Sequence, residues 1–196
     1  RPEQLSLGDT PPRLILRGDR VTGLVLPEVS ALPAGSLAPL TELQVLQLRG
    51  PIHDLNTIAE ASGLRDLLLT NAPISDLARL AALPRLETLT LENTRLESLR
   101  SLPSASTLPH LRSLTIVGGP LRSIAELGPR PALQKFALRD TAVTSLSGLE
   151  GAPGLTHLLA SDNHIVDISA IANMGALSWI ELNNNAIIDS RVLATL

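Results

Sequence analysis

The chain has 196 residues, of which 44% are hydrophobic, but it contains one Phe, one Trp and no Tyr. Its apolar residues are therefore mainly aliphatic, and its 42 leucines make up about one residue in five, which indicates that leucine fills a regularly repeated place. This apolar content and a formal net charge of -3 exclude a disordered chain, and the absence of cysteine excludes a disulfide-stabilised scaffold.

The charge balance gives no reason to expect nucleic acid or an anionic membrane surface as a partner. Sixteen basic residues stand against nineteen acidic ones, and fifteen of the basic residues are Arg. The longest apolar runs, such as residues 67–69, are far too short to cross a bilayer. We therefore expect no nucleic acid partner and no insertion into a membrane. The chain begins with Arg1 rather than Met, which points to a fragment or a processed product.

The first predicted element is a β-hairpin near the amino terminus. Residues 13–26 contain two runs of alternating apolar residues on either side of Gly18 and Asp19, a pair typical of a tight turn. We assign residues 1–20 to an N-terminal cap region, and we expect the hairpin to cover the open end of the core that follows.

Residues 21–196 repeat one pattern of leucine-type residues about eight times and are predicted to form one continuous domain. Each unit opens with L-x-x-L-x-L, and successive units begin 22 residues apart, except for one interval of 21 and one of 25 residues. We number the positions of a unit from its first leucine-type residue. The units begin at Val21, Leu43, Leu64, Leu86, Leu111, Leu133, Leu155 and Leu177.

The pattern resembles the signature of the leucine-rich-repeat family, L-x-x-L-x-L-x-x-N-x-I/L. The segments Ser75-Asp76-Leu77 and Val166-Asp167-Ile168 are most similar to the short 22-residue class, which is SDS22-like or internalin-like. The resemblance implies that the Asn at position 9 bonds the backbone of its own turn and of the neighbouring unit. Here Asn occupies that position only as Asn163 and Asn185, while threonines at the same position can make part of these bonds.

The spacing also predicts the fold on physical grounds. Positions 4 and 6 point the same way from a strand, and later apolar residues at three-residue spacing fit a 3-10 or irregular return segment. No unit can bury its apolar stripe alone, so units must stack. We predict an α/β leucine-rich-repeat solenoid, a curved horseshoe segment with a parallel inner β-sheet, a mostly 3-10 or irregular convex side and little α-helix.

Two places depart from the regular repeat. The 25-residue interval contains Ser104-Ala105-Ser106, which we interpret as a loop insertion away from the strands. The last unit runs to Leu196 without a recognisable cap, so aliphatic surface is expected to be exposed there. We favour a domain of a longer protein, in which further repeats or domains of the same chain, or a partner, meet this end.

The sequence offers no convincing active site. Its four histidines lack zinc-binding spacings, cysteine chemistry is excluded, and no phosphate-binding loop or calcium loop is present. We therefore predict no cofactor, no metal and no catalytic residue. A hydrolase remains an alternative because Asp140, His157 and Ser161 fall on adjacent predicted strands; it predicts a deep pocket around His157.

The concave sheet is the surface most suited to binding, because positions 2, 3, 5, 7 and 8 present side chains to a partner there. Its mixed charges and lack of interleaved aromatic residues do not suit a phosphate backbone or stacked bases. The alternative for its lone Trp is packing against side chains near the carboxyl end. The predicted partner-binding residues are Lys135, Arg139, His157, Leu159, Trp179, Glu181, Leu68 and Glu92.

These observations predict a non-enzymatic protein–protein interaction module that binds another protein on its concave face. The alternative is a ligand-sensing or regulatory leucine-rich-repeat domain of a larger signalling protein, NLR-like or of another multidomain kind. The lack of cysteine is compatible with the cytoplasm, which we slightly favour, and with a bacterial surface or secreted protein. The preference for Arg over Lys and the abundance of Ala and Pro are typical of a GC-rich, bacterial genome.

Overall fold

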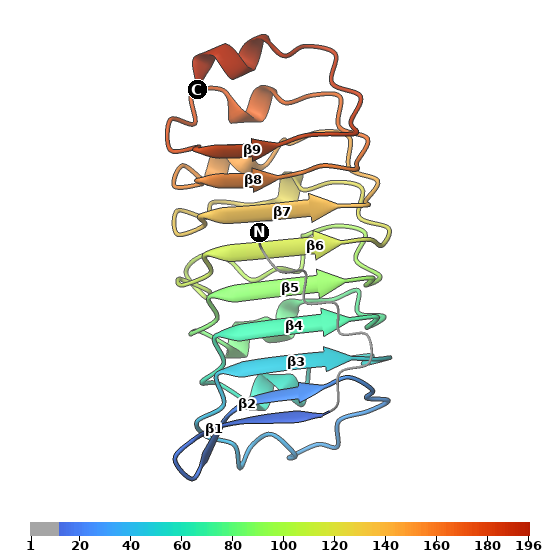
Figure 1. Cartoon of the computed structure of the whole chain (residues 1–196), viewed down its shortest axis with the longest axis vertical. Helices are drawn as coiled ribbons and strands as arrows, with labels where there is room; N and C mark the ends of the chain where they lie inside the picture. Colours follow the sequence, from blue (N-terminus) through green and yellow to red (C-terminus); the bar gives the residue numbers. More distant parts are fainter. Residues whose placement is uncertain (1–11) are drawn as a thin grey trace.

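The computed structural model describes residues 12–196. Nine strands form one sheet in which every strand lies beside its neighbours in the sequence (Figure 1). The first pair is antiparallel and all later pairs are parallel. The strands are β1 (Arg13–Arg17), β2 (Arg20–Leu26), β3 (Val45–Arg49), β4 (Asp66–Thr70), β5 (Thr88–Glu92), β6 (Ser113–Val117), β7 (Lys135–Arg139), β8 (His157–Leu159) and β9 (Trp179–Glu181).

The position of a residue within its unit decides its place in the sheet. In each parallel pair, residues at the same repeat position are Cα partners, as in Leu46 with Leu67 and Leu67 with Leu89. Positions 4 and 6 are buried in the five-residue strands from β3 to β7, while position 5 between them is half-buried. The predicted parallel sheet with two inward-facing positions per strand is confirmed.

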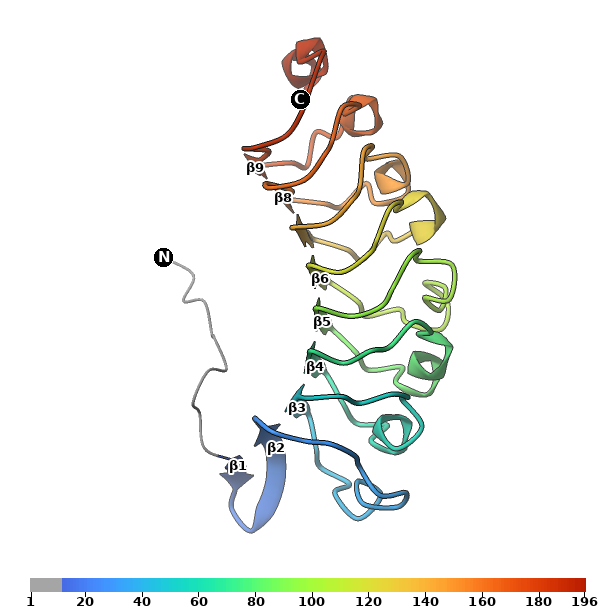
Figure 2. The ribbon, with the colours of Figure 1, turned by 90° about the vertical axis from the view of Figure 1, so that its right-hand side faces the viewer.

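The side opposite the sheet consists of short 3-10 helices and irregular segments, as predicted. Figure 2 shows these helices on the outer side of a curved stack whose inner side is the sheet. Residues 12–196 contain no α-helix. The 3-10 helices are η1 (Ile58–Glu60), η2 (Ala78–Ala82), η3 (Ala125–Leu127), η4 (Leu149–Gly151), η5 (Ser169–Ile171) and η6 (Arg191–Thr195).

One aliphatic core runs through the stack between the sheet and the convex side. It is built almost entirely from Leu, Ile, Val and Ala, and Phe136 on β7 is the largest side chain buried in it. Each fully buried Leu or Ile contributes about 1.5–3 kcal/mol relative to an exposed one, so adjacent units stabilise one another through this core. The leucine-rich composition is thus explained by the interior of the solenoid.

The N-terminal hairpin is present, but it covers less than the sequence suggested. β1 pairs with β2 around Gly18, whose φ of 62° suits the turn. All five residues of β1 are exposed, and Leu14 and Leu16 remain open to solvent within the described chain. Within the described residues, the hairpin therefore extends the edge of the sheet and leaves β1 exposed.

The insertion in the 25-residue interval lies away from the strands, as predicted. It is held by Arg130, whose Nη2 donates to the Pro103 carbonyl at 2.5 Å and whose Nε donates to the Leu127 carbonyl at 3.0 Å. Only 3% of Arg130 is exposed, and burial lowers the pKa of its guanidinium. This side chain joins the inserted loop to the following unit.

The last unit leaves apolar side chains exposed, in agreement with the absence of a recognisable cap in the sequence. Ile188 is 84% exposed, and Leu193 and Leu196 are also exposed. In the described part of the chain, no helix has the length and apolar character needed to cross a membrane.

Candidate functional site on the concave sheet

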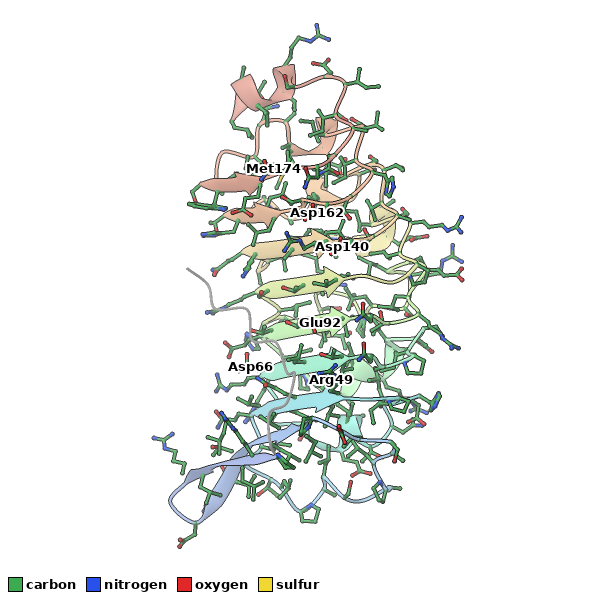
Figure 3. All side chains as sticks on the ribbon, turned by 45° about the vertical axis from the view of Figure 1, so that its right-hand side comes forward. Arg49, Asp66, Glu92, Asp140, Asp162 and Met174 are labelled. Atoms are coloured by element: carbon green, nitrogen blue, oxygen red, sulfur yellow. The ribbon has the colours of Figure 1, made fainter. Side chains whose placement is uncertain are left out.

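The concave face is formed by the residues at positions 3, 5 and 7 of each unit. These side chains alternate with the buried ones, so the same strand that fills the core also projects three residues from the sheet. Between β3 and β6, most of them are half-buried, because each lies against the equivalent side chain of the next strand. Figure 3 shows how these side chains follow the curved sheet from one unit to the next.

The strand ends are fixed by a row of residues at position 8 that sequence reasoning missed. Asn71, Asn93, Asp140, Asp162 and Asn184 all have positive φ values between 52° and 60°. The recurrence of Asn, Asp and Gly at position 8 could have predicted this row, because Asn and Asp tolerate the left-handed conformation better than most residues other than Gly. These residues turn the chain from the concave sheet towards the convex side at the same point in each unit.

The residues at position 8 also bond one another along the stack. Asn93 Nδ2 donates to Asn71 Oδ1 at 2.9 Å, and Asn184 Nδ2 donates to Asp162 Oδ1 at 2.6 Å. Gly118 occupies the position between these pairs with a φ of 68°, and a Cβ there would lie 2.4 Å from Asn93 Oδ1. Glycine adopts this conformation without strain, and a side chain there would require the Asn93 side chain to shift.

Beneath the concave surface, the position 9 asparagines make the bonds that the family resemblance implied. Asn163 Nδ2 donates to the carbonyls of Leu138 and Ala160, while its Oδ1 accepts from the Thr141 amide at 3.0 Å and the Thr141 hydroxyl at 2.6 Å. Asn185 repeats the two carbonyl bonds one unit later, to Ala160 and Leu182, but its Oδ1 accepts from the Ile165 amide, at position 11 rather than position 9. These bonds give the β7–β9 part of the sheet a rigid base.

The structure brings most of the predicted partner-binding residues together at β7–β9. Lys135, His157 and Trp179 are successive Cα partners across the three strands. Leu159 and Glu181, at position 5 of β8 and β9, are also Cα partners. We call these five residues and Arg139 the tryptophan patch.

The indole of the tryptophan patch is exposed on the sheet. Trp179 is 54% exposed, and its Nε1 donates to Glu181 Oε1 at 2.8 Å. This bond holds the ring against the neighbouring Glu181 side chain, while about half of the tryptophan residue stays exposed. The patch therefore presents an oriented aromatic surface.

Arg139 is held by a carboxylate that the sequence analysis did not associate with it. Its Nε lies 2.7 Å from Asp162 Oδ2, and this ion pair is partly exposed. The Asp162 hydrogen bond raises the pKa of Arg139. The pKa of Asp162 lies below its ordinary value of 3.8, first because of the hydrogen bond from Asn184 and then because of the one from Arg139. The guanidinium is thereby fixed at the rim of the patch.

This arrangement predicts a graded response of Asp162 to substitution. We expect Asn184→Gly, which preserves the positive φ, to raise the pKa of Asp162 more than Arg139→Gln does. Titration of the Asp162 side-chain carbon by NMR measures both changes. Because the folded-state pKa is lowered, the contribution of Asp162 to stability is present above pH 3.8 and is lost as the pH falls through the folded-state value. A larger effect of Arg139→Gln would contradict this order.

Leu68 and Glu92 lie apart from the tryptophan patch, in a hollow over β3–β5. The hollow has a volume of about 390 Å³. Thr70 on β4 donates to Glu92 Oε2 at 2.9 Å and so fixes that carboxylate at the end of β5. The lining of this β3–β5 hollow includes Val45, Gln47, Asp66, Leu68, Thr90 and Glu92.

The residues of the hydrolase alternative do not form a catalytic arrangement. The hydroxyl of Ser161 is buried and has no hydrogen-bond partner among the described residues, and His157 Nδ1 is 2.9 Å from the Thr156 hydroxyl. His157 does not line the β3–β5 hollow or the hollows formed around Pro27, His53 and Ser104. Within residues 12–196, no group of three or more His, Asp or Glu residues is placed to hold a metal ion.

Comparison with known proteins agrees with this architecture. An internalin C2 from Listeria monocytogenes is 26% identical with a TM-score of 0.79, covering 90% of this chain and 77% of that one. A leucine-rich-repeat protein from Leptospira interrogans is 16% identical with a TM-score of 0.62, over 90% of this chain and 52% of that one. The plant peptide hormone receptor RGFR1, in complex with RGF2, is 20% identical with a TM-score of 0.59, over 85% and 28%.

No protein-family profile matches the chain, and no curated protein shows a significant match. The fold is nevertheless defined by the 22-residue period, the parallel sheet and the structural neighbours together. The protein is a leucine-rich-repeat protein, and its fold is similar to that of internalins.

Proposed function

We propose that this protein is a non-enzymatic binding module that holds another protein on its concave sheet. The observation that carries the proposal is the tryptophan patch, in which the lone Trp of the chain is more than half exposed on β9 and Arg139, two strands away on β7, forms an ion pair with Asp162. Trp and Arg are enriched among the residues that dominate binding energy in protein interfaces.

The patch combines features that favour binding at low entropic cost. The bond from Trp179 to Glu181 and the ion pair from Arg139 to Asp162 hold both side chains in place before a partner arrives. Less rotamer freedom is therefore lost when the partner covers them. Leu159, half-buried on β8, adds apolar surface next to the indole.

The structural neighbours support a binding role of this general kind. The solved structures with a similar fold include the plant peptide hormone receptor RGFR1 in complex with RGF2, and PEPR1-AtPEP1. Leucine-rich-repeat solenoids offer an extended concave surface that suits a polypeptide partner. For this chain, we place the contact at the tryptophan patch.

Alanine substitution of the patch tests the proposal. A partner is first captured with the intact protein from an extract of the organism that produces it, identified and purified. We expect Trp179→Ala combined with Arg139→Ala to weaken binding of that partner by about tenfold or more, because loss of a central hot spot costs about 2 kcal/mol. Surface plasmon resonance measures the change in Kd.

The matched control removes one aliphatic side chain and one arginine outside the sheet. Val166 and Arg95 are both exposed and lie between the strands and the convex side. We expect Val166→Ala combined with Arg95→Ala to leave the affinity unchanged. Equal affinities of the two double variants would overturn placement of the contact at the tryptophan patch.

A further inference from the structure

The β3–β5 hollow has a chemical pattern of its own along the direction of the strands. Asp66 stands at position 3 of β4, Leu68 at position 5, and Glu92 at position 7 of β5, next to its Cα partner Thr70. The hollow therefore has a carboxylate at each end and an apolar middle in which Leu68 lies beside Thr90. Figure 3 labels Asp66 at the beginning of its strand and Glu92 on the neighbouring strand.

Neither carboxylate forms an ion pair within the part of the chain that the structure describes. Among residues 12–196, no ion pair involves Asp66 or Glu92, in contrast to Asp162, which is paired with Arg139. Among the described residues, the Glu92 carboxylate accepts a hydrogen bond only from the hydroxyl of Thr70. That bond fixes the orientation of the carboxylate without supplying a positive charge. Both residues are half-buried, so a cation placed over them would interact in a partly desolvated setting.

The spacing of these three features matches an extended polypeptide. Position 7 follows position 3 by four residues along a strand, which corresponds to about 13 Å at about 3.3 Å per residue. In an extended segment, every second side chain points to the same side, so residues i, i+2 and i+4 face the sheet together. Such a segment lying along the seam between β4 and β5 would place them over Asp66, Leu68 and Glu92.

We propose that the β3–β5 hollow binds an extended segment of a partner protein with a basic residue at i, an apolar residue at i+2 and a basic residue at i+4. This proposal deepens the proposed function and rests on it, since it names the chemistry of a second contact on the same concave face. The pattern is symmetric, so either chain direction fits.

Arg49 makes the two ends of the hollow unequal. It stands at position 7 of β3, separated from Glu92 by Thr70, and it lines a neighbouring hollow of about 530 Å³. Its positive charge weakens the attraction of a cation to the Glu92 end, while Asp66 lies at the far end of the strands. The requirement for a basic residue is therefore stricter over Asp66 than over Glu92.

Selection of displayed peptides tests this inference directly. The probe is a library of linear random peptides selected on the intact protein. We expect enrichment of Lys or Arg at i and i+4 around an apolar residue at i+2. Enrichment of a helical spacing, with basic residues at i and i+7, or of no basic residue at all, would overturn the proposal.

Isosteric substitutions then assign the selected peptides to the hollow. Asp66→Asn and Glu92→Gln remove charge and keep shape, so we expect each to weaken peptide binding by about tenfold, Asp66→Asn more strongly. Glu97→Gln, at an exposed carboxylate outside the strands, is the matched control and should have no effect. Equal binding by Asp66→Asn, Glu92→Gln and Glu97→Gln, or equal binding of a scrambled peptide, would refute the assignment.

The two proposals fail in different ways. If the β3–β5 hollow is a separate contact, Trp179→Ala leaves the affinity for the selected peptide unchanged. The same substitution weakens binding of the native partner. Loss of peptide binding in Trp179→Ala would show that the peptide occupies the tryptophan patch and would overturn the proposal for the hollow.

Discussion

Phe136→Ala is expected to lower the free energy of unfolding by about 3–5 kcal/mol, the range typical of removing a large aromatic side chain from a packed core. Phe136 is completely buried on β7, between Leu114 of β6 and Leu158 of β8 in the register of the sheet. Neighbouring leucines are anchored in their own units and cannot fill the cavity. Urea denaturation followed by circular dichroism measures the change.

Phe136→Leu is the matched control for this substitution. Leucine occupies the same position in the units on both sides, so it retains most of the buried apolar surface and restores the regular pattern. We expect a loss clearly smaller than that of the alanine variant. A loss below about 1 kcal/mol for Phe136→Ala would mean that β7 does not pack as described.

The second large effect is expected at Asn163. Asn163→Ala removes the bonds to Leu138 and Thr141 beneath the sheet and leaves their backbone groups without this partner in a buried place. Each buried polar group left unsatisfied costs about 1–3 kcal/mol, so we expect a total loss of about 2–4 kcal/mol. The same urea titration provides the measurement.

Two other asparagines provide the comparison. Asn183→Ala, at an exposed position 7, is expected to change stability by less than about 0.5 kcal/mol. Asn185→Ala removes equivalent bonds in the half-buried last unit and should have an intermediate effect, because water can replace the lost partners there. Equal effects at Asn163 and Asn183 would contradict a structural role for the position 9 asparagine.

Much of the fold was predictable because residues that are one repeat apart in the sequence lie side by side on neighbouring strands. Once Lys135, His157 and Trp179 share a repeat position, their alignment on consecutive strands follows, and the structure confirms it. The burial of positions 4 and 6 follows equally from the alternation of strands. The 3-10 segments opposite the sheet were predicted from the three-residue spacing of the later apolar residues.

Features that depend on contacts outside the pattern were less accessible. The hairpin was predicted from its own residues, but the exposure of all five residues of β1 depends on their surroundings, which alternation does not reveal. The row of left-handed residues at position 8 was not predicted because three residue types, Asn, Asp and Gly, share that position in place of one repeated letter. The ion pair of Arg139 with Asp162 joins position 7 of one unit to position 8 of the next. The repeat aligns only residues at the same position, so it did not predict this pair.

The candidate site divides in the same way. The sequence predicted which side chains share the concave face, including Leu68 and Glu92, because strand alternation decides this. It did not predict that Leu68 and Glu92 line a hollow with Asp66, since the depth of a surface depends on the sizes of side chains on three strands. The choice of these residues as a contact for a partner stays a prediction.

Site-specific photocrosslinking tests the central claim, binding on the concave sheet, most directly. A photoreactive amino acid is placed at Leu159 on β8 or at the exposed Ser147 outside the strands, and the intact protein is irradiated with its purified native partner. The account predicts a crosslink from position 159 that disappears in Trp179→Ala, and none from position 147. A crosslink from position 147 alone, or one from position 159 that persists in Trp179→Ala, would contradict it.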